Sequence, residues 1–332
     1  MSGASSVATG RSSGLRGDGV MMIPGCGLAS DSRRQLRPAP TTGQPFRFTS
    51  SQAILMPHMT TLTNDSFSLD GRVAVVTGGY GVIGGCIASA LAARKARVVI
   101  LGRRRDVAEE KVASLSRAGG DAMAVVGDVL DASQIRSARE TVLGAWGQVD
   151  ILFNGAGGNV SRARNDNRPI FEVPLDAFDE VLRLNLHGTL IPSLVFGEAM
   201  AARGAGSIIN VSSMASYQAL SGVLGYSVAK AGIDNLTRWL AVELARKHGA
   251  GVRVNAIAPG FFVSEQNRAV LITPDGGYTD RARSIIAKTP MARFGRPDEL
   301  VGAVEWLASD ASSFVTGAVV PIDGGFSSFS GV

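Results

Sequence analysis

A glycine-rich turn between an apolar run and a helical pattern constrains the fold of this chain more than any other feature. Residues 72–77 form an apolar run typical of a buried strand, and residues 85–96 carry apolar side chains at helical spacing. Between them, Gly79, Gly81 and Gly84 match the pattern G-x-G-x-x-G. A strand, a glycine turn and a helix in this order let the backbone approach a pyrophosphate, which predicts a dinucleotide site. A tight turn that binds nothing is the alternative.

The alternation of strand and helix continues along the chain. Further strands are expected at 97–101, 122–126, 149–153, 207–211, 252–257 and 318–322, and helices at 108–117, 133–146, 176–190, from Tyr226 onward and at 297–307. This alternation predicts an α/β fold of the Rossmann type, with a doubly wound, mostly parallel seven-stranded sheet and helices on both faces. The sheet forms a single domain over residues 65–332. Ligands of such sheets bind at the carboxyl ends of the strands.

Three side chains capable of proton transfer follow one another in residues 213–230. Ser213 comes just after the strand at 207–211, Tyr226 follows it by 13 residues, and Lys230 lies four residues further on. In a helix, Tyr226 and Lys230 share one face. A tyrosine and a lysine at this spacing also occur by chance, so their interpretation depends on the glycine turn upstream.

The chemistry of this trio is proton transfer to or from an alcohol. A free phenol has a pKa of about 10, which is too high for a base at neutral pH. A neighbouring ammonium favours the phenolate, so Lys230 is expected to lower the pKa of Tyr226. The Ser213 hydroxyl is expected to hold the substrate oxygen in place.

The residues after the second strand bear on the choice of cofactor. A site for NAD places an acid here to bind the ribose hydroxyls, but this chain has Gly102 followed by Arg103, Arg104 and Arg105. Guanidinium groups suit a 2′-phosphate, so NADP(H) is favoured and NAD(H) is the open alternative. Solvated charges on a loop would explain the same arginines without a ligand.

Charge and cysteine content exclude several classes of function. Residues 1–60 carry six Arg, no Lys and two Asp, so most of the net charge of +5 lies there and the rest of the chain gives no reason to expect nucleic-acid binding. No run of 18 apolar residues occurs, and no membrane span is expected. Two cysteines, Cys26 and Cys86, imply no disulfide and favour a reducing, cytoplasmic location. No metal site is predicted.

Residues 1–64 are expected to form a disordered N-terminal extension. They are rich in Ser, Gly, Arg, Pro and Thr and lack apolar periodicity, so they bury too little apolar surface to offset chain entropy. The Arg- and Ser-rich, acid-poor composition is also that of a mitochondrial transit peptide, but no amphipathic helix is evident. Met56 and Met59 precede the folded part, and an over-extended start site is favoured over targeting.

With these residues in place, the chain resembles the short-chain dehydrogenase/reductase family over roughly residues 67–332. The motifs that carry the resemblance occur in family order: Thr77–Gly84, Asp128, Asn154–Gly157, Asn185, Ser213, Tyr226-x-x-x-Lys230 and Pro259-Gly260. One position departs from the family pattern T-G-x-x-x-G-x-G, because Val82 stands where the pattern has its second glycine. The turn is therefore expected to differ in shape.

The resemblance implies an NAD(P)-dependent oxidoreductase. Its catalytic residues would be Asn185, Ser213, Tyr226 and Lys230, in which Tyr226 is the general acid/base, Lys230 also contacts the nicotinamide ribose and Asn185 supports a proton-relay water. The expected cofactor-binding residues are Thr77, Gly78, Gly79, Gly81, Val82, Ile83, Gly84, Arg103, Arg104, Asp128, Val129, Asn154, Gly155, Ala156, Gly157, Tyr226, Lys230, Pro259, Gly260, Phe262 and Ser264.

Longer strings resemble a sugar-acid subgroup of the family, the short-chain type of D-mannonate oxidoreductase, also called fructuronate reductase. These strings are TGGYGVIG, NGAGGN, APGFFVSEQNRAVL, TPMARFGRPDEL and DGGFSSFSGV. The implied reaction is reversible hydride transfer to the ketone of a hexuronate, D-fructuronate giving D-mannonate. Gluconate 5-dehydrogenase and 3-oxoacyl thioester reductase are alternatives with the same chemistry. A non-catalytic dinucleotide-binding sensor is the alternative of another class.

A sugar acid needs a cation for its carboxylate and polar partners for its hydroxyls. The candidate substrate-binding residues follow the fourth and sixth strands: Gly158, Asn159, Arg162, Gln266, Asn267 and Arg268. Each arginine is otherwise a solvated surface charge. The family is commonly oligomeric, and Val228 and Trp239 form a second apolar line on the helix of Tyr226. A homodimer or homotetramer is therefore expected.

Overall fold

The computed structural model describes residues 64–166 and 168–331, without the side chains of Asn64, Asp65, Glu265 and Gln266. The extension predicted for residues 1–64 lies outside this range except for its last residue.

Seven parallel strands form one sheet in the order β3-β2-β1-β4-β5-β6-β7. Their bounds are β1 Val73–Thr77, β2 Arg97–Gly102, β3 Ala122–Val126, β4 Ile151–Asn154, β5 Gly206–Val211, β6 Val252–Pro259 and β7 Val319–Ile322. The order reverses between β1 and β4, because β2 and β3 extend the sheet on one side and β4 to β7 on the other. Such a switch point opens a crevice at the carboxyl ends of the strands.

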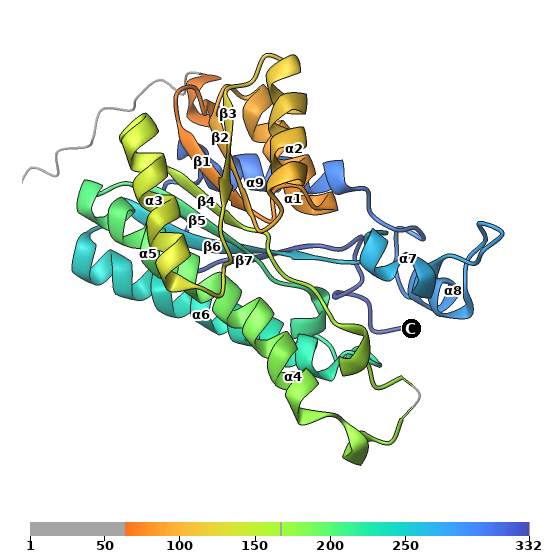
Figure 1. Ribbon diagram of the computed structural model, residues 1–332. Helices are drawn as coiled ribbons and strands as arrows, with labels where there is room; N and C mark the ends of the chain where they lie inside the picture. The colour runs from red at the N-terminus through yellow and green to blue at the C-terminus, as the bar shows by residue number, and fades with distance from the viewer. Residues whose placement is uncertain (1–63, 167, 332) are drawn as a thin grey trace, which may run out of the picture. The chain divides into compact units, whose positions relative to one another are not determined.

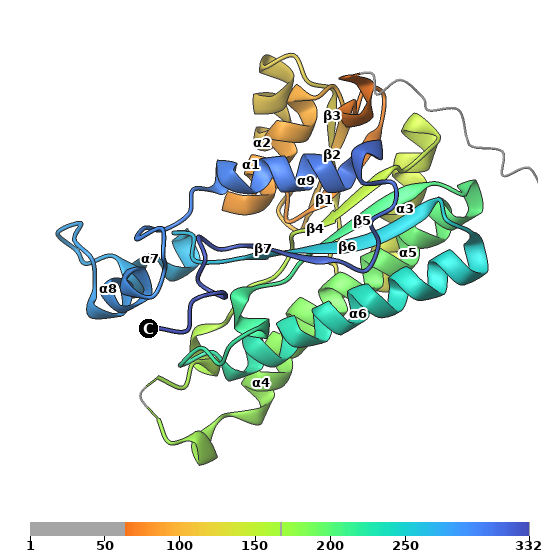
Figure 2. The same cartoon turned by 180° about the vertical axis from the view of Figure 1, so that it is seen from behind.

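Helices cover both faces of the sheet, as Figures 1 and 2 show. One face carries α1 Val82–Ala93, α2 Arg105–Arg117 and α9 Val301–Ala308; the other carries α3 Ala132–Trp146, α5 Gly188–Arg203 and α6 Leu224–His248. Alternate residues of β1 serve the two cores: Ala74 and Val76 pack on the first face, and Val73 and Val75 on the second. Burial on both faces explains why these strands are continuous apolar runs.

The carboxyl ends of the strands carry the remaining elements. Helix α4, Leu175–Leu182, lies on the α6 side of this end, and α7 Glu265–Leu271 with α8 Asp280–Ala287 extends beyond β6 (Figure 1). The segment between β6 and residue 290 therefore holds two helices, α7 and α8. Both groups lie where a ligand of the sheet would enter.

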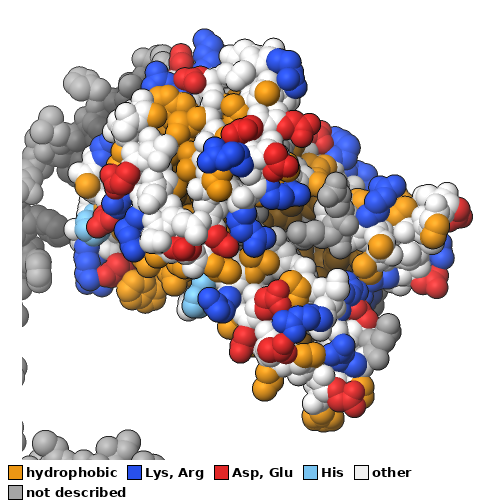
Figure 3. All heavy atoms as spheres, in the orientation of Figure 1, with side chains coloured by type: hydrophobic (Ala, Val, Ile, Leu, Met, Phe, Trp, Pro, Cys, Tyr) orange, Lys and Arg blue, Asp and Glu red, His pale blue; other side chains and the backbone are white. Residues whose placement is uncertain are grey.

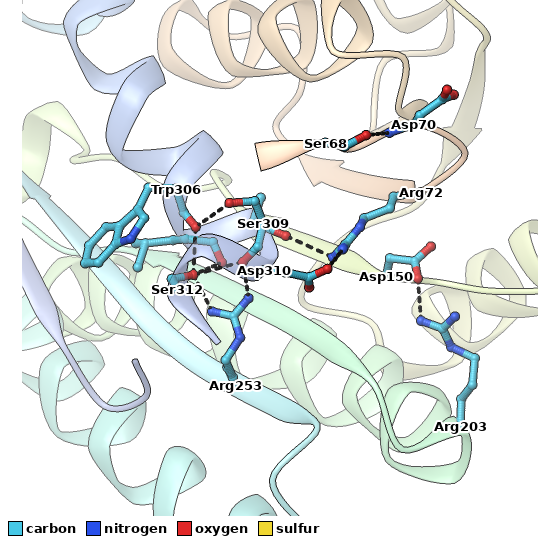
Figure 4. A network of polar contacts seen from close by, with 12 residues as sticks. Ser68, Asp70, Arg72, Asp150, Arg203, Arg253, Trp306, Ser309, Asp310 and Ser312 are labelled. Atoms are coloured by element: carbon cyan, nitrogen blue, oxygen red, sulfur yellow. Dashed lines mark hydrogen bonds and ion pairs between the residues drawn. The ribbon is translucent and has the colours of Figure 1, made fainter. Parts of the chain in front are cut away.

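The amino ends of the strands are tied together by ion pairs and hydrogen bonds (Figure 4). Asp150 accepts the Val73 backbone N–H at 2.7 Å and pairs with Arg203. Arg253, which is 7% exposed, donates to the Ser312 hydroxyl and the Ser309 carbonyl. These contacts connect β1, β4, β6 and the segment after α9, so the polar groups named here at this end of the sheet bond to one another.

Several helix boundaries differ from the expected ones, among them α2, which begins at Arg105, and α9, which begins at Val301. Helix α1 begins at Val82 rather than Gly85, because Gly81 takes the extended conformation of an N-cap. The helix expected at 176–190 continues to Arg203 and contains a wide turn of π-helix at Arg183–His187. Pro192 sits inside α5, in its second turn, without ending the helix.

Charged side chains of both signs are interspersed over the face drawn in Figure 3. No helix among the described residues has the length and apolar character that crossing a bilayer requires. Within residues 64–166 and 168–331, no three His, Cys, Asp or Glu side chains are grouped as a metal site would need.

Candidate active site

Tyr226 and Lys230 lie in the first turns of α6, which begins at Leu224. Ser213 follows β5 directly and caps a short 3-10 turn by accepting the Ala215 N–H at 3.1 Å. Tyr226 and Ser213 are close enough for a hydrogen bond between their hydroxyls to act on the tyrosine pKa. The structure thus brings the predicted serine and tyrosine together at the end of the sheet.

Lys230 is almost fully buried, with 4% of its surface exposed. Its Nζ donates to the Val211 carbonyl at 2.7 Å and lies 5.3 Å from the centre of the Tyr226 ring. Burial lowers the pKa of Lys230 to about 8, against a smaller opposite effect of Asp234. The ammonium is therefore held beside the phenol at the cost of its hydration.

The expected depression of the Tyr226 pKa is not found. Burial raises the pKa of the Tyr226 phenol above its usual range, and the hydrogen bond with Ser213 offsets only part of this effect. The physical reason is that desolvation penalises the phenolate, while the Lys230 ammonium points to the Val211 carbonyl instead of the phenol oxygen. In this arrangement the phenol keeps its proton.

Asn185 lies in the π-helical turn and is fully buried. Its side-chain oxygen accepts the Gly158 N–H at 3.1 Å, and its nitrogen donates to the Gly158 and Val181 carbonyls. A Cβ on Gly157 would lie 2.8 Å from the Asn185 oxygen and 3.7 Å from the Lys230 Nζ. The segment after β4 therefore meets the catalytic candidates, and only glycine fits at residue 157.

The glycine turn opens the N-terminus of α1. Gly81 is its N-cap and no side chain caps the helix, so the N–H groups of the first turn are oriented toward any phosphate placed there. A Cβ on Gly84 would come within 2.3 Å of the Gly78 carbonyl, so this turn closes only with glycine. The turn thus fits a pyrophosphate despite Val82, which begins the helix where the family pattern has glycine.

The segment after β2 gathers cations beside this turn. The Arg104 guanidinium lies 5.0 Å from the centre of the Tyr80 ring, and the Arg104 N–H donates to the Tyr80 hydroxyl at 3.4 Å. Arg103 lies 3.9 Å from the Asp128 carboxylate at the end of β3. Both arginines are therefore placed next to the expected nucleotide, together with Asp128.

The segment after β4 contacts the glycine turn through its backbone. The Ala156 N–H donates to the Thr77 hydroxyl at 3.1 Å. The Asn154 side chain faces inward, however, and donates to Ser193 and to Asn210 of β5. The Asn154 side chain therefore bonds to the interior of the sheet.

The segment after β6 turns toward α7. Gly260 lies against Asp323, Phe262 is buried against Gly295, and Ser264 is the N-cap of α7. A cavity of about 400 Å³ lies between this segment and the residues after β7; its lining includes Phe262, Met291, Arg293, Glu299 and Gly324. Its lining contains none of Asn185, Ser213, Tyr226 and Lys230, so this cavity is distinct from the catalytic cluster.

The expected substrate-binding residues fall into different places. Arg162 pairs with Asp176 at 2.5 Å and Glu180 at 2.7 Å on α4, so it is not the free cation that a carboxylate requires. The Asn267 side chain bonds to the backbone: its nitrogen donates to the Phe262 carbonyl, and its oxygen accepts the Ser264 N–H. Arg268 is exposed, and the side chain of Gln266 lies outside the description. Asn159 has a buried amide nitrogen without a hydrogen-bond partner among the described residues.

Sequence reasoning missed Arg281, which reaches back from α8 to the turn before α6. Its guanidinium donates to the Ser221 hydroxyl and to the Ser221 carbonyl, each at 2.9 Å. Nothing in the local sequence signals this contact, because the two residues are 60 positions apart.

Comparison with known proteins decides the family. A family profile of the short-chain alcohol dehydrogenase type, described as Enoyl-(Acyl carrier protein) reductase, matches residues 80–327. The chain belongs to the short-chain dehydrogenase/reductase family. An uncharacterized oxidoreductase, UxuB, of Bacillus subtilis is 44% identical over 275 residues, which cover 80% of this chain and 98% of that protein.

Solved structures of the family agree with this assignment. A Haemophilus influenzae structure described as a "putative D-Mannonate oxidoreductase" with bound NAD has a TM-score of 0.76 and 40% identity, over 80% of this chain and 98% of that one. A gluconate 5-dehydrogenase from Burkholderia cenocepacia, in complex with NADP and tartrate, has a TM-score of 0.72 and 34% identity, over 80% and 98% of the two chains. The chain is therefore an NAD(P)-dependent oxidoreductase of this family.

Proposed function

We propose that this short-chain dehydrogenase/reductase interconverts a sugar-acid ketone and its alcohol, with D-fructuronate and D-mannonate as the pair. The observation that carries the proposal is the juxtaposition of Ser213, Tyr226 and Lys230 with the glycine-rich segments after β1 and β4. The similarity to the Haemophilus influenzae structure supports a sugar acid as substrate.

The chain's own residues provide the proton and hold the substrate oxygen. When bound, a reduced nicotinamide dinucleotide would supply the hydride that the substrate carbon gains in reduction, and the oxidised dinucleotide would accept that hydride in the reverse direction. Tyr226 gives its phenolic proton to the carbonyl oxygen during reduction and takes it back during oxidation, and the Ser213 hydroxyl orients that oxygen. The Lys230 ammonium, 5.3 Å from the ring centre, favours the phenolate that donation leaves behind.

The raised pKa of Tyr226 suits one direction of this reaction. Because burial keeps the phenol protonated, the site is prepared to donate a proton at neutral pH. Ketone reduction needs such a donor, whereas alcohol oxidation needs a base.

Replacing Tyr226 by Phe tests the assignment of the acid. Y226F is expected to lower kcat for D-fructuronate reduction by roughly 10²- to 10⁴-fold with little change in KM, because only the proton donor is removed. Tyr217, which is 44% exposed and donates to the Val319 carbonyl, offers a matched control. Y217F should keep normal kcat. A near-normal kcat for Y226F would defeat the assignment.

A second candidate is gluconate 5-dehydrogenase, which the similarity to the Burkholderia cenocepacia enzyme favours. The two functions share the catalytic residues and differ only in the keto acid. Initial rates with D-fructuronate, D-tagaturonate and 5-keto-D-gluconate separate them. A higher kcat/KM for 5-keto-D-gluconate than for either hexuronate would select the second candidate.

We propose NADP(H) as the preferred cofactor. Arg103 and Arg104 support it, since both lie beside the Tyr80 and Asp128 end of the nucleotide site and bring positive charge where a 2′-phosphate would lie. The same assay run with NADPH and NADH tests the preference. A kcat/KM that is higher with NADH would reject it.

We also propose a homodimer or homotetramer, located in the cytoplasm. Apolar side chains on α5 and α6 are exposed in the single chain, among them Leu194, Val228, Trp239 and Val242. Exposed large apolar side chains on neighbouring helices are typical of a subunit contact. Light scattering that gives the mass of one chain would reject the oligomer, and recovery of the protein with organelles would reject the location.

A further inference from the structure

A cluster of two arginines and one aspartate joins three segments at the carboxyl end of the sheet. Arg281 of α8 lies 3.6 Å from the Asp166 carboxylate, and Arg164 pairs with the same carboxylate at 2.5 Å. Arg281 also donates to the Ser221 hydroxyl and carbonyl, just before α6. We call these three residues, Arg164, Asp166 and Arg281, the arginine cluster.

The arginine cluster borders the catalytic residues. Ser221 lies five residues before Tyr226, and the Asn165 N–H donates to the Gly222 carbonyl at 3.4 Å. The same loop packs Val160 and Ala163 around Tyr226. Two members of the arginine cluster, Arg164 and Asp166, and the side chains packed around Tyr226 therefore belong to one segment, residues 160–166.

The charge of the arginine cluster favours an anion. Two guanidinium groups share one carboxylate, whereas Arg162 faces two carboxylates of α4. The side chains of Arg164, Asp166 and Arg281 keep 30%, 25% and 29% of their surface exposed, so the excess positive charge is open to a ligand.

The hydrogen bonds of Arg281 leave one edge of its guanidinium unused. The two terminal nitrogens donate to Ser221, while the edge formed by Nε–H and the second Nη2–H donates to no described residue. A guanidinium edge with two parallel N–H groups is the geometry that binds a carboxylate through both oxygens. Ser221 and Asp166 hold the group in place for this contact.

We propose that Arg281 binds the substrate carboxylate and thereby selects sugar acids over neutral ketoses. This inference rests on the proposed function and names the residue that gives it its specificity. Asp166 then acts as a positioning residue, which orients Arg281 and moderates the charge of the arginine cluster.

The test compares two sugars that differ only at the acid group. D-fructuronate and D-fructose carry the same ketone, but fructose has a hydroxymethyl group in place of the carboxylate. In the full-length enzyme, R281M is expected to raise KM for D-fructuronate by roughly 10- to 100-fold, the effect of losing a charge-assisted contact. The kcat/KM for D-fructose should stay within about twofold, and R281K should recover part of the fructuronate affinity.

Two further variants distinguish recognition of the substrate carboxylate by Arg281 from a purely structural role of Arg281 in holding α8 in place. Arg283 lies on the same helix, is 63% exposed and pairs with Asp280, so R283M should leave both sugars unaffected. D166N removes the carboxylate that orients Arg281, so it should raise KM for D-fructuronate by a smaller factor than R281M does and leave D-fructose unaffected. Equal losses on both sugars in R281M, or a loss in D166N as large as in R281M, would overturn the proposal.

Binding of tartrate, measured by calorimetry, keeps the test independent of turnover. The wild-type protein should bind this dicarboxylate at least tenfold more tightly than R281M. If neither sugar is reduced, the proposed function fails, but this difference still supports the anion site. Equal binding of tartrate by the two proteins, or none by the wild type, would overturn the inference on its own.

Discussion

The two ends of the sheet differ in whether their polar groups have hydrogen-bond or ion-pair partners. At the amino ends of the strands, polar groups are paired: Asp150 with Arg203 and Val73, and Arg253 with Ser309 and Ser312 (Figure 4). At the carboxyl ends, glycines form the loops, and Asn159, Asn165 and Ser227 each keep a buried polar atom without a partner among the described residues.

This difference indicates that the amino ends of the strands contribute mainly to stability and the carboxyl ends mainly to ligand binding and catalysis. Paired groups at the amino ends lower the free energy of the folded state and leave nothing for a ligand to bind. Unpaired atoms and a buried ammonium at the carboxyl ends cost folding free energy, which the paired end and the core offset. Variants at the two ends should therefore change different measured quantities.

The largest effect is expected from a methyl group at the carboxyl end. G157A places a Cβ 2.8 Å from the Asn185 oxygen, so Asn185 must shift. Because catalytic groups tolerate little displacement, kcat should fall about 100-fold, or about 2.7 kcal/mol of activation free energy.

Stability should change little by comparison, and thermal unfolding measures it. The control is G144A, since a Cβ on Gly144 in α3 meets nothing within 4 Å. If G157A lost stability and kept its kcat, the assignment of this end to chemistry would be wrong.

The complementary variant lies at the amino end. D150A leaves the Val73 N–H without its acceptor and the Arg203 guanidinium without its carboxylate. The free energy of unfolding should fall by about 2 kcal/mol, as for a lost buried hydrogen-bond acceptor, with kcat unchanged. Denaturant unfolding measures the loss. D121A, at an exposed pair with Arg97, should cost less than about 0.5 kcal/mol. A fall in kcat for D150A would contradict the conclusion that the amino ends of the strands contribute to stability and not to catalysis.

The smallest effect concerns the cost of the buried lysine. The pKa of Lys230 is about 8 in the folded chain and 10.5 without burial, so below pH 8 the folded state bears the full cost of the charge. K230M should be more stable than the wild type by about 1 kcal/mol at pH 7, although it is catalytically impaired.

The sign of this difference should change with pH. As pH rises from 8 toward 10.5, the wild type loses its penalty and keeps the hydrogen bond to the Val211 carbonyl, so the advantage of K230M should shrink and reverse. Denaturant unfolding at several pH values measures it, with K247M at an exposed site as control. If the difference in unfolding free energy between K230M and the wild type did not vary with pH, the free-energy cost assigned to the buried Lys230 charge would be wrong.

The fold was predictable because its signals are local. All seven strands occur where the apolar runs predicted them, and β3 has the expected bounds, Ala122–Val126. Glycine and proline marked most ends of elements. The start of α1 was predicted three residues too late, at residue 85, because Gly81 serves as the N-cap and the helix already begins at Val82.

The site was predictable only in part. Ser213, Tyr226 and Lys230 follow from spacing, since a strand end and one helix turn place them. The partners of Arg162 and the contact of Arg281 depend on tertiary packing and on segments far apart in sequence. The pKa of Tyr226 also depends on burial, which spacing does not reveal.

The wide turn at Arg183–His187 has a consequence for how this chain tolerates insertion and deletion. A π-turn holds one residue more than the α-helical turn it replaces, so Leu175–Arg203 is a single rod with a surplus residue at Asn185. Deleting one residue there would restore a regular helix and rotate the amide out of register with Gly158. The most regular version of this helix would thus lose the contact between Asn185 and the segment after β4.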